Sequence, residues 1–375
     1  MAKRPASICA VVTAHNVEEC LGECLASLAA QTFSDFEAIV VEDGSSDETA
    51  RIANEFALQD DRFRVVHTSN LGAAGARNHG LALVDSPYFM LLDGDDVFLP
   101  TMLEALHGQA IRCEADVVVC DIVQFDHNSG ERTAAPWALK ESQLPNLAET
   151  PSFSWRDVPG NVFAAFMGWP WDKLYRTAFA RSAGLSFPDD LSNSEDMLFT
   201  YQAIILAQRI AVVNEVLIEH RIGRGGSVSN SRTRDPFAFY EGLCRMKRFL
   251  QEQPDGAWQS LRQPYLNWAL DWTLWNIETM SDQAVRNELA RHLGANGFPE
   301  LELADHEPAY FTGYPRNMAR YASALNDWSG NNPDQGPLGP LADLPYGKFK
   351  PWCQASLSEK IAIKRRMRKA LPTEW

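Results

Sequence analysis

The sequence predicts an α/β fold in which a mostly parallel central sheet carries helices on both faces. Short apolar runs rich in β-branched residues alternate with helical patterns through the first 125 residues. The helical patterns between them are long enough to form the crossover connections that parallel strands need. Alternation of this kind is typical of βαβ units, whose helices cover both sides of a sheet.

The expected elements follow one another in order along this first part of the chain. Strands are expected at residues 7–12, 38–41, 64–67, 88–92 and 115–120, and helices at residues 17–30, 47–58, 75–84 and 100–113. Asn16 stands where an N-cap of the first helix belongs, and Glu18 and Glu19 suit the positive end of its dipole.

The remainder of the chain changes character twice. Residues 126–160 are polar, hold four prolines and lack periodicity, which predicts an excursion or a hairpin-bearing insert. Regular patterns return at residues 162–167, 178–183 and 196–207, a strand-like run follows at 210–218, and helical patterns occupy 236–251, 261–280, 282–293 and 356–371. We therefore expect a catalytic domain at residues 1–235 and a helical C-terminal region at residues 236–375.

Composition and charge exclude several classes of protein. The chain has 375 residues, and its net charge of −15 argues against a non-specific nucleic-acid binder. No segment approaches the ~18 uninterrupted apolar residues of a membrane span, and the N-terminus is typical of a first strand rather than a signal peptide. The seven cysteines are scattered without a CxxC pair, which disfavours a disulfide framework or zinc site and favours a reducing cytoplasm.

Polar and acidic residues follow the expected strands at their carboxyl ends, where open α/β sheets bind ligands. Thr13, His15 and Asn16 come after the first strand, Asp43 after the second, Arg77 after the third, and Asp93, Asp95 and Asp96 after the fourth. Since these four ends meet at one edge of the sheet, the sequence predicts a site there in which carboxylates dominate.

Asp93 and Asp95 form the sharpest pair, because residues two apart in an extended backbone point to the same side. Two carboxylates this close are costly unless a cation or hydrogen-bond donors lie between them. Mg²⁺ or Mn²⁺ would relieve that cost and leave positions open for phosphate oxygens. Gly94, between the two, would let a ligand approach the backbone closely. The alternative is a solvated acidic turn after a strand.

A second pair of carboxylates, Glu195 and Asp196, precedes an apolar run and so marks a helix start. One interpretation is a general base that the helix N-terminus keeps ionised. The other is ordinary first-turn acid that compensates the helix dipole. The pair alone does not decide between them.

A glycine-rich loop at residues 220–229 contains Arg221 and Arg224. Such a loop could close over a diphosphate, with the two arginines binding its oxygens. A surface loop with solvated arginines accounts for the same residues equally well.

Two groups of tryptophans have different interpretations. Trp169 and Trp171 are candidates for stacking on an acceptor sugar, although aromatic residues near a motif are more often part of a core. Trp268, Trp272 and Trp275 fall at helical spacing and predict a packing stripe.

Taken together, these stretches resemble the family 2 glycosyltransferases, an inverting group with the GT-A fold, here of the bacterial polysaccharide-biosynthesis type. Seven stretches carry the resemblance in order over about residues 5–235, namely ICAVVTAHN, VVEDGSSDET, NLGAAGARNHGL, MLLDGDDVFLP, WDKLYR, SEDMLF and HRIGRGGSVSN. The resemblance implies a Rossmann-like GT-A domain of the hexosyltransferase type. It also implies a nucleoside-diphosphate sugar as donor, with UDP expected, and a glycan or lipid-linked saccharide as acceptor.

The resemblance further implies roles for individual residues. Those that would bind the nucleotide sugar are Thr13, His15, Asn16 and Asp43 at the base, Arg77 near the nucleotide, and Asp93 at the ribose. Asp95 would be the main ligand of Mn²⁺ or Mg²⁺, supported by Asp96. Asp196 would be the catalytic base, taking the acceptor's proton, while Arg221 or Arg224 helps the metal to stabilise the leaving diphosphate.

Four positions depart from the family's usual pattern. Thr13 replaces a proline, His15 replaces a tyrosine, which weakens the expected base-stacking contact, and Glu42 replaces an aspartate. His220 stands where a tyrosine is common; it is a further candidate metal ligand, and the alternative is a packed or solvent-facing histidine.

Two rival functions stay open at this point. A nucleotidyltransferase would share the acidic metal site but would carry a basic, Gly-rich loop directly after the first strand, where this chain has THNVEE-like residues. A non-catalytic nucleotide-sugar or glycan-binding module would need no general base.

The C-terminal tail differs in charge from the rest of the chain. Residues 359–371 hold six Lys or Arg against one Glu, a local charge of +5. A basic amphipathic helix of this kind predicts contact with anionic lipid, and the alternative is a solvated helix end or a clamp onto the protein's own acidic surface. The expected location is the cytoplasm, with the inner face of the plasma membrane as the site of any such contact.

Overall fold

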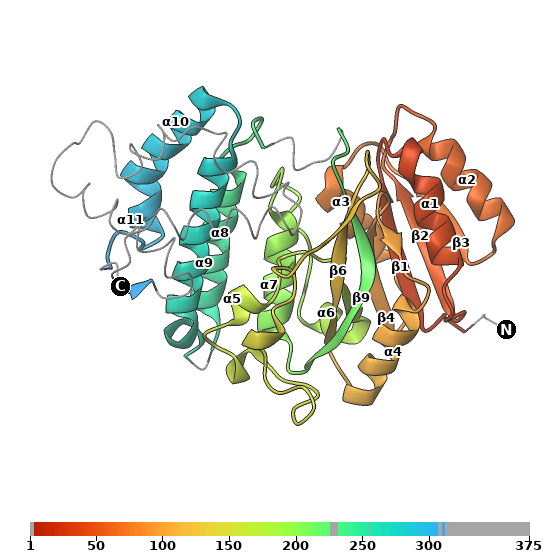
Figure 1. The fold of residues 1–375 in the computed structure, drawn as a ribbon, viewed down its shortest axis with the longest axis horizontal. Helices are drawn as coiled ribbons and strands as arrows, with labels where there is room; N and C mark the ends of the chain where they lie inside the picture. The colour runs from red at the N-terminus through yellow and green to blue at the C-terminus, as the bar shows by residue number, and fades with distance from the viewer. Residues whose placement is uncertain (1–3, 226–231, 255, 307–309, 312–375) are drawn as a thin grey trace. The chain divides into compact units, whose positions relative to one another are not determined.

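The computed structural model describes residues 4–225, 232–254, 256–306 and 310–311 (Figure 1). These residues fall into two compact units. The first comprises the described residues of 1–228 and 248–261, and the second those of 229–247 and 262–375. The division of the chain at residue 235 stays a prediction, and the basic tail at 356–371 lies outside the described residues.

The first unit is built on a nine-stranded sheet, which is mostly parallel as the sequence predicts. The strands are β1 (Ile8–Ala14), β2 (Phe36–Glu42), β3 (Phe63–His67), β4 (Tyr88–Asp93), β5 (Val97–Phe98), β6 (Val117–Asp126), β7 (Arg132–Ala134), β8 (Lys173–Arg176) and β9 (Ile210–Ile222). Their order is β3-β2-β1-β4-β8-β6-β9-β5, and β7 pairs with β6. β1, β2, β3, β4, β6 and β9 run in one direction, and β5, β7 and β8 run against them.

Helices cover both faces of this sheet, which confirms the predicted layering (Figure 1). They are α1 (Glu18–Ala29), α2 (Thr49–Gln59), α3 (Gly72–Ala82), α4 (Met102–Cys113), α5 (Val162–Ala165), α6 (Thr177–Ser182) and α7 (Glu195–Leu206), with 3₁₀ turns at Glu141–Gln143 and Trp155–Asp157. α1, α2 and α4 share a core with Ala10 and Val12 of β1. On the other face, Phe199 of α7 packs edge-on against Tyr175 of β8. Because both faces are covered, β1 is apolar throughout except at Thr13.

α3 lies very close to the sheet, and a glycine permits this approach. A Cβ at Gly80 would lie 2.2 Å from Val11 Cγ1 and 3.2 Å from Val41 Cγ2. Any side chain at residue 80 would therefore push the helix away from β1 and β2.

The loops after β1 and β2 are fastened to each other, and this corrects the prediction for Asn16. Asn16 is not the N-cap of α1; it has a positive φ of 50° and its side-chain oxygen accepts from the Ser46 backbone N–H at 2.9 Å. Asp47, from the other loop, accepts from the Glu18 N–H at 3.1 Å instead. Because asparagine tolerates the left-handed conformation, it suits this crossed connection.

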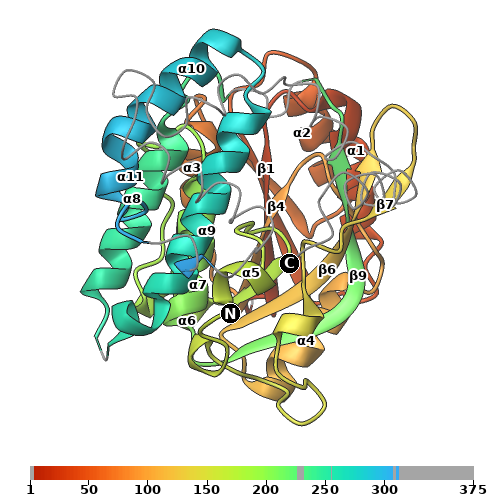
Figure 2. The ribbon, with the colours of Figure 1, turned by 60° about the vertical axis from the view of Figure 1, so that its left-hand side comes forward.

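The polar insert contains the predicted hairpin, formed by β6 and β7 (Figure 2). Two strands were not predicted. β5 has only two residues, and β8 coincides with the stretch WDKLYR, which was predicted only as part of a motif. β8 lies antiparallel between β4 and β6 and so joins the two parallel parts of the sheet.

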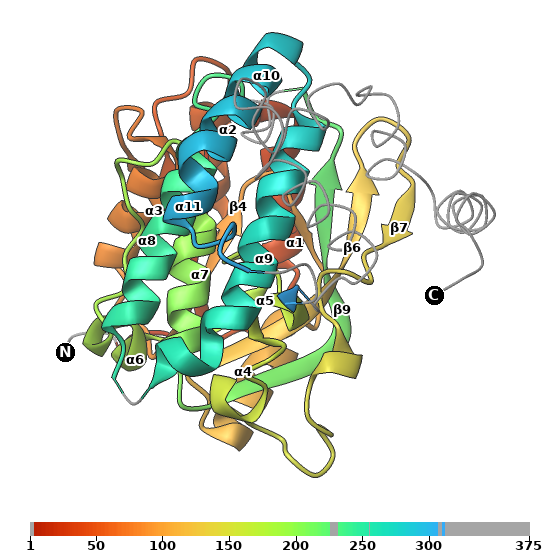
Figure 3. The same cartoon turned by 90° about the vertical axis from the view of Figure 1, so that its left-hand side faces the viewer.

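The last described elements are helical, as predicted. They are α8 (Ala238–Glu252), α9 (Ala257–Thr279), α10 (Gln283–His292), a π turn at Leu293–Gly297 and α11 (Phe298–Glu300). α8 and α9 run side by side, and Tyr265 donates to the Leu243 carbonyl at 2.8 Å (Figure 3). In the tryptophan stripe, Trp268 is buried and the rings of Trp272 and Trp275 stack at 4.8 Å. Among the described residues, no helix combines the length and apolarity that crossing a membrane requires.

Lys173, the first residue of β8, is fully buried. Its ammonium donates to the Met167 and Trp169 carbonyls at 3.1 and 2.7 Å and pairs with the Asp172 carboxylate at 2.5 Å. Burial raises the pKa of Asp172, and the Lys173 charge opposes that rise. Lys173 thus ties the loop that carries Trp169 to the sheet.

We expect Lys173→Met to lower the free energy of unfolding by about 3–5 kcal/mol, because Asp172 would stay buried without its cation. Urea unfolding followed by circular dichroism measures the change. Arg51→Met is the control, since Arg51 pairs with Glu48 and Glu55 at an exposed position and its loss should change the free energy of unfolding far less. Equal losses in the two variants would contradict the assignment.

Candidate active site

The carboxyl ends of β1, β2 and β4 meet at one edge of the sheet, as the sequence predicts. β1 lies between the other two, so that Thr13 is in register with Val41 and with Asp93. The residues after these strands therefore share one edge.

Arg77 binds two carboxylates at this edge. Its two terminal nitrogens lie 2.9 Å from Asp93 Oδ1, at the end of β4, and 2.9 Å from Glu195 Oε1, at the start of α7. The Phe187 ring covers the guanidinium at 5.5 Å, and the Thr13 hydroxyl lies 3.4 Å from Asp93 Oδ1. Burial alone would lower the pKa of Arg77, but Asp93 and Glu195 raise it above its usual value. The result is a buried, charged bridge between a strand end and a helix start.

Asp196 is half-buried in the first turn of α7, and its Oδ1 accepts from the Met197 N–H at 2.7 Å. Burial, followed by the negative charge of Glu195, raises the pKa of Asp196 to about 7, against the opposing effect of Arg77. Burial and the Glu195 charge thus act against the ionised form that the helix start was expected to favour. A carboxylate with a pKa near neutrality suits proton transfer.

Arg224 pairs with the Asp95 carboxylate. Its terminal nitrogen lies 3.0 Å from Asp95 Oδ2, and a second nitrogen donates to the Asn16 carbonyl at 3.1 Å. The glycine-rich loop is thus joined to the loop after β1.

Arg221 is placed differently from Arg224, although the sequence predicts the same role for both. It is 7% exposed and donates to the Asp95 carbonyl and to Glu23 Oε2, both at 2.6 Å. Its guanidinium also lies 4.6 Å from the centre of the Phe125 ring. In this structure the Arg221 side chain holds the turn after β4 to α1 and β6, and its contact with a diphosphate stays a prediction.

Asp96 is fully buried and accepts from two residues of β9. Its Oδ1 lies 3.0 Å from His220 Nδ1 and 2.8 Å from the Arg221 N–H. Burial raises the pKa of Asp96, whereas Asp96 raises the pKa of His220 against the effect of burial. The His220 ring also stacks on Trp171 at 4.5 Å. The structure therefore contains the packed histidine that was the alternative to a metal ligand, and metal ligation by His220 stays a prediction.

The predicted metal ligands can be compared with the needs of a divalent cation. Among the described residues, no group of three or more His, Cys, Asp or Glu side chains is gathered to hold a metal ion. A cation that also binds substrate phosphates needs only one or two protein carboxylates. Asp96 Oδ2 is buried without a hydrogen-bond partner among the described residues. Asp95 and Asp96 thus fit Mn²⁺ or Mg²⁺ in the company of phosphate oxygens.

Asp43 fixes the start of α3. Its carboxylate accepts from the Thr68 hydroxyl and the Leu71 N–H, both at 2.6 Å, and from the Gly72 N–H at 2.8 Å. His15 Nδ1 lies 2.7 Å from the Asp43 carbonyl. The carboxylate therefore caps a helix from another segment and stabilises the positive end of its dipole. Its predicted contact with a nucleotide base is not tested by this geometry.

Gly94 lies close to the neighbouring strand, and its expected role in letting a ligand approach the backbone stays a prediction. A Cβ at Gly94 would lie 2.8 Å from the Thr13 carbonyl oxygen and 3.4 Å from Ala14 Cβ. The close approach that requires a glycine is that of the neighbouring strand β1.

The tryptophans near β8 form one aromatic cluster. Trp171 is buried, so the core interpretation holds for it. Trp169 is half-buried, stacks on Trp171 at 4.7 Å and meets Trp137 edge-on at 5.1 Å. Sequence reasoning missed Trp137, which comes from the polar insert.

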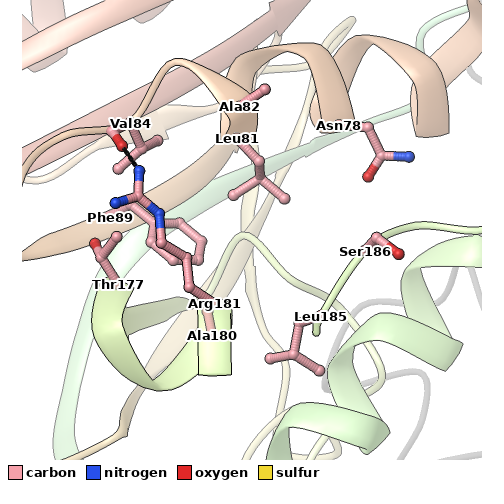
Figure 4. A pocket seen from close by; sticks show the side chains of 10 residues that line it. All are labelled: Asn78, Leu81, Ala82, Val84, Phe89, Thr177, Ala180, Arg181, Leu185 and Ser186. Atoms are coloured by element: carbon pink, nitrogen blue, oxygen red, sulfur yellow. Dashed lines mark hydrogen bonds between the residues drawn. The ribbon is translucent and has the colours of Figure 1, made fainter. Parts of the chain in front are cut away.

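A pocket of about 310 Å³ lies beside the start of β4 (Figure 4). Leu81, Ala82 and Val84 at the end of α3 face Ala180 and Arg181 of α6 across it. None of the predicted site residues lines this pocket.

Sequence reasoning also missed the contacts that hold Arg77. Asn78 exchanges two hydrogen bonds with the Phe187 backbone, at 2.7 and 2.8 Å, and Glu195 pairs with Arg77 across 118 residues. The available indication was a lone arginine within a run of small residues, GAAGARN, which suggests that its side chain has a buried partner.

Comparisons with known proteins agree with this geometry. Residues 9–168 match the model of glycosyl transferase family 2. The chain is 32% identical over 214 residues to the uncharacterized glycosyltransferase EpsJ of Bacillus subtilis, covering 56% of this chain and 60% of EpsJ. It is 28% identical over 250 residues to the succinoglycan biosynthesis protein ExoU of Rhizobium meliloti, covering 64% of this chain and 69% of ExoU. The chain thus spans less than two thirds of EpsJ.

Solved structures confirm the expected GT-A fold. S. aureus TarS 1–349 in complex with UDP-GlcNAc matches with a TM-score of 0.65 at 19% identity, over 86% of this chain and 92% of that one. By the family match at residues 9–168, the related curated glycosyltransferases and this shared fold, the chain is similar to the family 2 glycosyltransferases.

Proposed function

We propose that this protein transfers a sugar from a nucleoside-diphosphate donor to a hydroxyl of a glycan or lipid-linked acceptor, with inversion at the sugar carbon and with the help of a divalent cation. The observation that carries the proposal is the Arg77 bridge. It joins Asp93, which follows β4, to the first turn of α7, where Asp196 has a pKa near neutrality.

Asp196 acts as the general base in this proposal. The acceptor oxygen forms a bond to the sugar carbon while the bond from that carbon to the diphosphate breaks. The acceptor proton goes to Asp196, and the bonding electron pair leaves with the nucleoside diphosphate. One carboxylate is enough, because a diphosphate leaves without a proton from an acid, in contrast to the paired carboxylates of glycosidases.

The cation, when bound, neutralises charge that develops on the diphosphate. Asp95 is its proposed main ligand and Asp96 its support. Arg224 can add positive charge there, since its side chain already reaches the Asp95 carboxylate. A related structure supports this cofactor, because the mannosyltransferase PcManGT of Pyrobaculum calidifontis, with a TM-score of 0.51, was solved with GDP-Man and Mn²⁺.

The donor nucleotide is proposed to be UDP. TarS, a poly(ribitol-phosphate) beta-N-acetylglucosaminyltransferase, was solved with UDP-GlcNAc and with UDP. The name of ExoU supports a role in the synthesis of polysaccharides. Thr13, His15, Asn16 and Asp43 stay the proposed contacts of the base, and a cytoplasmic location and peripheral attachment through the basic tail stay part of the proposal.

The role of Asp196 predicts the behaviour of Asp196→Asn. We expect kcat to fall by about 10²–10⁴-fold, because a positioned base contributes a factor of that size, while binding of UDP measured by calorimetry stays unchanged. Asp189→Asn, at an exposed position before α7, should keep full activity. A matching loss of UDP affinity in Asp196→Asn would argue against the base.

The pKa of Asp196 also predicts a pH dependence of the wild-type enzyme. The base must be ionised, so kcat/KM should rise with pH and level off above about 7. Ionisation of Asp196 has the opposite effect on folding: it lowers the free energy of unfolding as pH rises. Because its folded pKa lies above its unfolded value, its stabilising contribution is lost as pH rises from about 4 to about 7.

The metal proposal predicts that excess EDTA and Asp95→Ala each abolish transfer, and that Mn²⁺ restores activity only to the EDTA-treated wild type. Product formation with UDP-sugars as donors measures this. Asp61→Ala, at an exposed position, should behave like the wild type. Full activity in excess chelator would refute the metal dependence.

A further inference from the structure

Glu195 differs from an ordinary acid in the first turn of a helix. Such acids act through the dipole and normally face solvent, as Glu18 and Glu19 do at the start of α1. Glu195 is only 5% exposed and its carboxylate is 2.9 Å from the buried Arg77. Burying a carboxylate is costly, so compensation of the dipole does not explain this position.

The start of α7 is held by contacts from α3. Its N-cap, Ser194, has a positive φ of 65° and makes no capping hydrogen bond with its side chain. The preceding residues 183–194 form neither helix nor strand. From α3, Arg77 binds Glu195 and Asn78 binds the Phe187 backbone. The Phe187 ring stacks on Phe199 of α7 at 4.2 Å.

From this geometry we infer that Glu195 is a positioning residue, which binds Arg77 and thereby fixes the first turn of α7, and with it Asp196, relative to Asp93 at the end of β4. The inference rests on the proposed function, since it gives Glu195 a part in presenting the base. Asp196 follows Glu195 directly, so a rotation of the first turn would move both carboxylates together.

Glu195 also affects the charge that Asp196 experiences. The charged groups that act on Asp196 are Glu195 on its own helix, Arg77 on α3 and Asp93 on β4. Glu195 and Asp93 raise the pKa of Asp196 and Arg77 lowers it. Removal of the Glu195 charge should therefore shift the titration of Asp196 to lower pH, which a residue with a purely structural role would not do.

The test compares Glu195→Gln and Glu195→Ala with the wild type. Glutamine keeps a hydrogen-bond acceptor for Arg77, so we expect kcat to fall by about tenfold. Alanine removes the contact, and we expect kcat to fall by about 10²-fold, as a misplaced group does. UDP affinity, measured by calorimetry, should stay unchanged, and the acidic limb of kcat/KM should move to lower pH in both. Glu104→Gln is the control, since Glu104 is an exposed first-turn acid of α4.

A second measurement does not need turnover. The change in melting temperature caused by Asp196→Asn, followed against pH, reports the titration of Asp196. This change is measured once in the wild-type background and once in the Glu195→Gln background. We expect the transition to move to lower pH in the Glu195→Gln background. This readout also covers the case in which Glu195→Ala fails to fold.

The outcomes separate the two proposals. If the wild type transfers or hydrolyses no nucleotide sugar, the proposed function fails, and the melting cycle alone decides on Glu195. An unchanged transition in that cycle overturns the inference. If the wild type is active, the inference is also overturned when both Glu195 variants keep the wild-type kcat and pH profile. It is overturned as well when UDP affinity falls as much as kcat in these variants.

Discussion

A single buried guanidinium, that of Arg77, connects the end of β4 to the start of α7. Its two nitrogens bind two carboxylates that lie far apart in the sequence, those of Asp93 and Glu195. Breaking a buried ion pair costs about 3–5 kcal/mol, so the contact between Arg77 and Glu195 resists separation. The geometry of the site depends on this contact, because β4 and α7 are far apart in the sequence and the chain between them does not fix their distance.

The carboxylates at this edge of the sheet differ in how they are compensated. Asp43 accepts from backbone N–H groups, Asp95 is paired with Arg224, and Asp96 accepts from His220. Asp196 accepts from the Met197 N–H and lies beside Glu195. Its environment thus favours the protonated form and raises its pKa to about 7.

The local pattern of apolar and polar residues predicted most strands and helices of the fold, but it predicted fewer of the contacts in the candidate site. β1 to β4, β6 and α1 to α4 were predicted because their apolar periodicity is long and their order simple. β5 is too short to have a pattern, and β8 is antiparallel within an otherwise alternating chain, so neither was predicted. The strand-end residues were predicted from topology, whereas the Arg77–Glu195 pair and the different roles of Arg221 and Arg224 depend on tertiary contacts between distant segments.

The close packing of α3 has a consequence for chemistry at the sheet edge. Gly80 lies three residues after Arg77, about one turn along the same helix and on the same face. Because residue 80 has no side chain, α3 can lie close to β1. This short distance also determines how far the Arg77 guanidinium extends toward Asp93 and Glu195. An alanine at residue 80 would push α3 away from β1. The Arg77 side chain would then have to span a longer distance to its carboxylate partners.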